Sequence, residues 1–131
     1  MAEYDFPESL RYSREDEWAR VEGDRIVIGV SDYAQQQLGD IVFVELPDVG
    51  TVVSAGDPFG VIESVKTVSD LFAPISGEIV AVNADLAESP ETVNEDCYGD
   101  GWMIAIEPSD AEFETLLSAQ DYAQYVKDRE D

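Results

Sequence analysis

The sequence contains no histidine, a single cysteine and only two lysines among its 131 residues. The absence of histidine removes the usual general base, the histidine-paired nucleophiles and nearly every zinc site. Cys97 has no partner for an internal disulfide, so nothing in the sequence indicates an oxidising compartment. We interpret Cys97 as a small, semi-buried residue of the interior. A hydrolase triad is excluded, and an enzyme is the least favoured class of protein.

Basic residues are also scarce, with 7 Lys and Arg against 30 Asp and Glu, which gives a formal net charge of −23. A chain of this charge is repelled by nucleic acid and by anionic membranes. The carboxylates have two open interpretations: a solvated surface that keeps the protein soluble, or adaptation to a high-salt host. Matching to basic patches on partner proteins is compatible with either.

No apolar run is long enough to span a bilayer, and the first eight residues carry three acids and no Lys or Arg. This composition argues against a secretory signal and against a mitochondrial transit peptide, so we expect a cytoplasmic protein. Apolar residues make up 44% of the chain and charged residues 28%, as in ordinary globular proteins. We expect one domain over residues 1–131, because this length suffices for a single core.

Most of the chain has the pattern of short β-strands separated by turns. A hairpin is predicted over residues 17–30, turning at 22–24, followed by a helical turn over 32–38 with Ser31 as N-cap and Gly39 at its end. Residues 84–101 are rich in Asp, Glu, Asn, Pro and Gly, which predicts a loop. Further strands are predicted at 41–46, 51–54, 59–65, 68–72, 78–82 and 102–106.

The pattern changes after Pro108, where apolar residues recur at helical spacing. Ser118 and Asp121 form a capping signature, and two short helices are predicted over about 110–128. Their apolar side chains are interpreted as packing against a sheet: Phe113, Leu116, Leu117, Tyr122, Tyr125 and Val126. The fold class is therefore mainly β, with a core of about 10–108 and C-terminal helices.

Lys66 stands nearly alone, because the other lysine, Lys127, lies close to the C-terminus. It falls between two predicted strands, where the chain must reverse, so we expect its side chain to project into solvent. A primary amine on a flexible stem can carry a prosthetic group through an amide bond. An unmodified surface lysine in a turn is the ordinary alternative.

The neighbours of Lys66 decide between these two interpretations. The segment Glu63 to Asp70, with the downstream turn at 73–78, resembles the lipoyl-attachment hairpin of glycine cleavage H proteins. Related biotin carriers place their lysine between two methionines, whereas Lys66 lies between Val65 and Thr67. The resemblance extends over almost the whole chain through further segments: Tyr12, Glu17 and Trp18, then 29–35, 38–47, 93–94 and 98–102.

The resemblance implies a barrel-sandwich hybrid fold with lipoate bound covalently to Lys66. A lipoyl domain of a 2-oxo acid dehydrogenase would lack the N-terminal hairpin, the 98–102 loop and the C-terminal helices. The implied function is to shuttle the aminomethyl group of glycine from the P protein, glycine decarboxylase, to the T protein, aminomethyltransferase. The L protein, dihydrolipoyl dehydrogenase, then reoxidises the arm. The hard chemistry belongs to cofactors and partners.

The resemblance also implies roles for three carboxylates near Lys66. Glu17 and Asp70 are expected to line a cleft that receives the arm, with solvated acids at strand ends as the ordinary alternative. Glu63 and Asp70 are expected to help the lipoate-attaching enzyme recognise Lys66. The family usually has His where this sequence has Asp16, and Pro where it has Cys97. We expect Asp16 to make the rim of the cleft more acidic, and Cys97 to leave its loop less constrained than Pro would.

Two other functions remain open at this point. An H-like relay protein that donates lipoate to other 2-oxo acid dehydrogenases would need the same lysine. A plain acidic interaction module would leave Lys66 unmodified. The intact mass of protein from its native host separates the module from both carriers, because the module would gain no lipoyl group.

Overall fold

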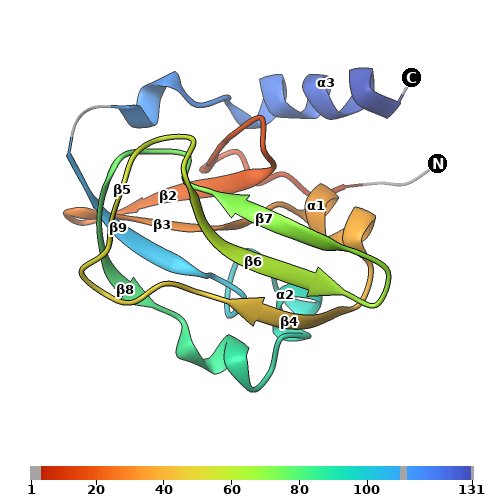
Figure 1. Cartoon of the computed structure of the whole chain (residues 1–131). Helices are drawn as coiled ribbons and strands as arrows, with labels where there is room; N and C mark the ends of the chain where they lie inside the picture. The colour runs from red at the N-terminus through yellow and green to blue at the C-terminus, as the bar shows by residue number, and fades with distance from the viewer. Residues whose placement is uncertain (1–3, 110–111, 131) are drawn as a thin grey trace.

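A computed structural model of the chain describes residues 4–109 and 112–130, and within these ranges it has nine strands in two sheets (Figure 1). The larger sheet has the order β1-β2-β3-β9-β8-β5 and the smaller one β4-β6-β7. The strands of the larger sheet are β1 Arg11–Tyr12, β2 Glu17–Glu22, β3 Arg25–Val30, β5 Val52–Val53, β8 Gly77–Val82 and β9 Ile104–Pro108. Those of the smaller sheet are β4 Ile41–Glu45, β6 Pro58–Ser64 and β7 Val68–Phe72.

The two predicted hairpins and the first helix are confirmed. β2 pairs antiparallel with β3, and β6 pairs antiparallel with β7. The helix α1 spans Asp32–Leu38, and the Ser31 side chain caps it by accepting a hydrogen bond of 3.2 Å from the amide of Ala34. Gly39 follows with a positive φ of 82°, which glycine adopts without steric cost. α1 therefore ends where the chain turns into β4.

The core has two parts, one apolar and one aromatic. The inward side chains of the two sheets, such as Ile28, Ile62 and Ile79, are almost fully buried in one cluster. Under the C-terminal helix α3, Ala119–Glu130, the second cluster stacks Tyr12 on Tyr122 with ring centroids 4.7 Å apart. The barrel-sandwich hybrid is thus confirmed as the fold class, with α3 covering the N-terminal strands (Figure 1).

The C-terminal apolar stripe packs largely as predicted. Tyr122 and Val126 are buried, and the amide of Asp121 donates to the Ser118 hydroxyl, as the capping signature predicts. The first of the two predicted helices is a short 3-10 turn, η2 Glu112–Thr115. Residues 110 and 111, with which the predicted helical region began, lie outside the described residues.

Three other predicted boundaries differ from the structure. β1 was not predicted, because a two-residue strand leaves no pattern to detect. The predicted loop over 84–101 contains the turns η1 Ala84–Ala87 and α2 Thr92–Glu95, both too short for a helical periodicity. β9 begins at Ile104 rather than Trp102 and continues to Pro108, along its pairing with β8.

The charge balance leads to a prediction about stability. Within the described parts of the chain only two ion pairs form, Arg20 with Glu22 and Asp16 with Arg129, so most carboxylates have no cationic partner. Ions screen the repulsion among these charges, so we expect the melting temperature at neutral pH to rise with NaCl concentration. A melting temperature that stays flat or falls would show that the repulsion is already balanced locally.

Candidate functional site

Lys66 lies at the tip of the β6–β7 hairpin, and Ser64 shapes that tip. The Ser64 amide donates to the Thr67 carbonyl over 2.8 Å. The Ser64 hydroxyl accepts from the amides of Lys66 and Thr67 at 3.3 and 3.2 Å. Because Ser64 is only 5% exposed, the turn is anchored from its buried side. Sequence reasoning missed this role, although serine hydroxyls commonly bond backbone amides within turns.

The tip presents its side chains to solvent while it stays attached to the rest of the protein. Lys66 is exposed, and so is Val65, at 72% of its surface. The Val65 amide donates to the Asp40 carbonyl over 3.1 Å, which fastens the tip to the segment between α1 and β4. A Cβ built on Gly39 would lie 3.7 Å from Cε of Lys66, so the lysine stem passes beside the end of α1. The lysine amine is therefore accessible to other proteins, while the backbone of the hairpin tip is held in place.

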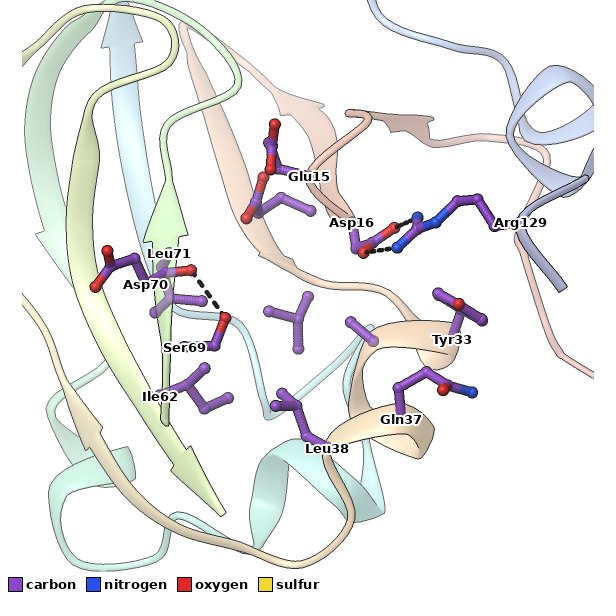
Figure 2. Close-up of a pocket in the computed structure, with 13 residues that line it drawn as sticks. Glu15, Asp16, Tyr33, Gln37, Leu38, Ile62, Ser69, Asp70, Leu71 and Arg129 are labelled. Carbon is purple, nitrogen blue, oxygen red and sulfur yellow. Dashed lines mark hydrogen bonds and ion pairs between the residues drawn. The ribbon is translucent and has the colours of Figure 1, made fainter. Parts of the chain in front are cut away.

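A cleft of about 250 Å³ lies between α1, the β6–β7 hairpin and the turn from β1 to β2 (Figure 2). We call it the hairpin cleft. Its lining combines an apolar floor with acidic groups and one cation, Arg129: Glu15, Asp16, Glu17, Val30, Tyr33, Ala34, Gln37, Leu38, Ile62, Ser69, Asp70, Leu71 and Arg129. Leu38 belongs to α1, whose end lies beside Lys66, so the cleft and the lysine share one supporting element.

Glu17 is a buried carboxyl that lines this cleft. It is 2% exposed, and its carboxyl accepts hydrogen bonds from the Ser13 hydroxyl at 2.7 Å and from the Phe72 amide at 3.3 Å. No ion pair reaches Glu17 from the described residues. Burial raises the pKa of Glu17 to about 8, because desolvation disfavours the carboxylate more than these two hydrogen bonds favour it. Glu17 is therefore largely protonated at neutral pH, and a cation that entered the cleft would favour its ionised form.

Asp70 also borders the cleft, but its carboxylate lies on the other side of β7. Figure 2 shows this carboxylate directed away from the centre of the cleft, whereas Ser69 and Ile62 point into it. The backbone carbonyl of Asp70 accepts a hydrogen bond of 3.4 Å from the Ser69 hydroxyl. The structure thus brings Glu17 and Asp70 to one cleft through different atoms, a carboxyl for Glu17 and the backbone for Asp70.

Glu63 lies on the same outer face of the small sheet. Its neighbours Ile62 and Ser64 are both buried, and successive side chains of a strand alternate between faces, so Glu63 points outward. It is paired with Phe43 of β4 and with Val68 of β7, and these two apolar side chains are exposed by 46% and 61%. The structure therefore places Glu63 next to the tip but outside the hairpin cleft.

Asp16 does not act as the sequence interpretation expected. Its carboxylate forms two bonds with the guanidinium of Arg129, at 2.6 and 3.1 Å, and accepts a third from the Tyr122 hydroxyl at 2.8 Å. The negative charge at this point of the rim is therefore balanced by Arg129. Residues 113 positions apart leave no local sequence signal of their contact, which is why Arg129 was missed.

Cys97 is buried in the structure, with 7% exposure, which confirms its interpretation as an interior residue. Its carbonyl accepts a hydrogen bond of 2.9 Å from the Trp18 indole. Burial, reinforced by nearby carboxylates, raises the pKa of its thiol to about 12. The Cys97 carbonyl thus joins its loop to β2 through this bond.

No cluster of three or more metal-binding side chains forms in the part of the chain that the structure describes. Within the same residues, no helix is long and apolar enough to cross a membrane.

Comparisons with known proteins agree on one family. Residues 10–129 match the model of the family described as "Glycine cleavage H-protein". A protein of Anaeromyxobacter sp. (strain K), named "Glycine cleavage system H protein", is 58% identical over 127 residues, which are 96% of this chain and 99% of the relative. A relative of the same name from Geobacillus thermodenitrificans is 59% identical over 93% of this chain and 97% of its own length.

Solved structures lead to the same result. The crystal structure of a glycine cleavage system H protein from Mycobacterium marinum superposes with a TM-score of 0.86 at 41% identity. The match covers 92% of this chain and 98% of the other. With the family match over most of the sequence and close relatives along its length, the chain belongs to the glycine cleavage H-protein family.

Proposed function

We propose that this chain carries lipoate on Lys66 and serves as the shuttle protein of a glycine cleavage system. When bound, lipoate supplies a disulfide that accepts the aminomethyl group of glycine and later returns to its oxidised form. The observation that carries the proposal is the placement of one exposed lysine on an anchored hairpin tip, beside a cleft with a buried carboxyl. The residues present fit the group, because the amine is free to form the amide and the cleft is next to it.

In this proposal the chain contributes three physical functions. The tip leaves the lysine side chain exposed, so that partner enzymes can reach the arm. The hairpin cleft offers Glu17 as a hydrogen-bonding partner for the end of the arm, and a cationic end would favour the ionised form of this carboxyl. Attachment to a protein raises the effective concentration of the arm at each docked partner. Glu63 and Asp70, on the outer face beside the tip, are then placed for recognition by the lipoate-attaching enzyme.

The partners follow from the same proposal: a P protein that decarboxylates glycine, a T protein that receives the one-carbon unit, and an L protein that reoxidises the arm. The chain itself would catalyse no step. We further propose that residues 1–131 act as one lipoyl-carrier domain in the cytoplasm. The β-bridge between Tyr12 and Leu117, which joins segments from opposite ends of the chain, supports the single domain. No observation favours the alternative of a lipoate relay.

A pair of assays tests the shuttle role. Lipoylated protein, supplied with a glycine-decarboxylating P protein and pyridoxal phosphate, is expected to support exchange of labelled bicarbonate into the carboxyl group of glycine. A pyruvate-decarboxylating enzyme is expected to acylate the same protein slowly or not at all. Because the arm is chemically the same in both assays, a difference must come from recognition of the carrier surface. Fast acylation from pyruvate without glycine exchange would refute the shuttle role and leave only a lipoyl carrier.

A further inference from the structure

The turn that precedes Glu17 has an uncommon backbone conformation. Asp16 has φ of +74°, and it is the one residue other than glycine with positive φ in the described ranges. Such a conformation costs free energy for a residue with a Cβ, although aspartate tolerates it better than most. Because Asp16 immediately precedes Glu17, this conformation directs the chain so that Glu17 enters the hairpin cleft.

Contacts from two other elements hold Asp16 in this conformation. From the N-cap of α1, the amide of Ser31 donates to the Asp16 carbonyl over 2.9 Å. From α3, Tyr122 donates to the Asp16 carboxylate, and the Tyr122 hydroxyl also lies 2.7 Å from the hydroxyl of Ser31. Arg129 adds its two bonds from the last turn of α3. The turn, α1 and α3 are therefore joined at one residue.

The Arg129 guanidinium is itself held in place. It lies 4.9 Å from the ring centroids of both Tyr33 and Tyr125, one on α1 and the other on its own helix. An exposed ion pair contributes little as a rule, but a bidentate arginine with restricted motion is the recognised exception. Arg129 also lines the hairpin cleft, and Figure 2 shows its guanidinium facing Asp16 across the rim.

We propose that Asp16 and Arg129 form a latch by which the C-terminal helix fixes the rim of the hairpin cleft that would receive the end of the arm. Both are positioning residues: Asp16 orients Glu17, and Arg129 holds Asp16. The inference rests on the proposed function, since it assigns these residues to the protection of the arm and its cargo. Breaking the latch loosens the last turn of α3 and the turn before Glu17, so that Glu17 loses its fixed position.

The test compares four variants of the full chain. Asp16→Asn keeps a residue that tolerates positive φ but removes the charge, and Arg129→Met removes the guanidinium while keeping an apolar stem. Arg129→Lys keeps the charge without the bidentate geometry. Lys127→Met is the matched control, because it removes an exposed cation from the same helix away from the cleft.

The first readout needs no lipoate. In the unmodified protein, amide hydrogen exchange over residues 13–17 and 119–130 is expected to speed up by about fivefold in Asp16→Asn and Arg129→Met, as loss of roughly one strong polar contact implies. Arg129→Lys should be intermediate, and Lys127→Met should match the wild type. Unchanged exchange in both Asp16→Asn and Arg129→Met would overturn the latch.

The second readout uses the lipoylated carrier, loaded by a glycine-decarboxylating partner that is then removed. Loss of the cargo to water releases formaldehyde and ammonia and leaves the free thiol, and formaldehyde is measured. Asp16→Asn and Arg129→Met are expected to lose cargo about fivefold faster than the wild type, which corresponds to the loss of roughly one strong polar contact. Faster loss in Asp16→Asn but slower loss in Arg129→Met would overturn the latch in favour of a simple charge effect.

Failure of the latch and failure of the proposed function give different results. If the proposed function is wrong, the wild-type protein takes up no lipoate or no cargo, whatever its hydrogen exchange. If only the latch is wrong, the wild type loads normally, and Asp16→Asn and Arg129→Met do not both release cargo faster than the wild type.

Discussion

Lys66→Arg is expected to abolish lipoylation completely while leaving the fold intact. The guanidinium keeps the positive charge, but it is a poor nucleophile and does not form the amide. The side chain of Lys66 is exposed, and the turn is held by backbone groups and by Ser64, so the substitution removes no buried contact. Intact mass and peptide mapping of protein made with lipoate available measure the effect.

Lys127→Arg is the matched control for this experiment. Lys127 is the second of the two lysines and is also exposed, so lipoylation should remain complete in this variant. Lipoate on Lys127 in the Lys66→Arg variant, or lipoate on neither lysine in the wild type, would contradict the assignment of Lys66. Thermal melting of both variants checks that neither loses its fold.

Glu17→Gln is expected to remove a large pH dependence of stability. The pKa of Glu17 is about 8 in the folded protein against 4.5 as its ordinary value, so between these values the folded state binds a proton that the unfolded state has released. The free energy of unfolding therefore falls as pH rises from 4.5 through 8, by at most about 1.4 kcal/mol per pH unit. The stabilisation that Glu17 contributes is fully present below pH 4.5, the ordinary pKa, and is lost as the pH rises through about 8, the pKa in the folded protein.

Chemical denaturation at roughly pH 6, 7, 8 and 9 measures this slope. The wild type should lose stability over this interval, whereas the Gln variant, which mimics the protonated acid, should lose much less. Glu45→Gln makes the same chemical change at an exposed residue of β4 and serves as control, because it also lowers the net negative charge. Parallel curves for the wild type and Glu17→Gln would mean that Glu17 is already ionised in the folded protein at the lowest pH of the series.

Local patterns in the sequence were sufficient for much of the fold. The N-cap at Ser31 and the reversal at Lys66 each depend on residues within a few positions, and the structure has both where they were predicted. The short turns between 84 and 101 were missed, because a four-residue helix has only one turn of periodicity. The sequence did not show which strands share a sheet, because partners such as β3 and β9 are separated by more than half the chain.

For the site, the sequence predicts only which side chains of a strand face inward and which face outward. The sequence places Asp70 next to Leu71, so a buried Leu71 requires the Asp70 side chain to face outward. Strand alternation alone therefore separates the Asp70 carboxylate from Glu17, whereas the family resemblance placed both in the cleft. The contact of Asp16 with Arg129 and the burial of Glu17 depend on how α3 and the turn pack, which no local pattern encodes.

The burial of Cys97 has a consequence for redox behaviour. A carrier whose arm cycles between disulfide and dithiol would be disabled if a thiol of its own attacked that disulfide, because a mixed disulfide would tether the arm to the surface. Attack requires the thiolate, and a pKa of about 12 leaves almost none at neutral pH. Since Cys97 is the only cysteine in the sequence, the chain can pass through oxidising and reducing steps without cross-linking to itself.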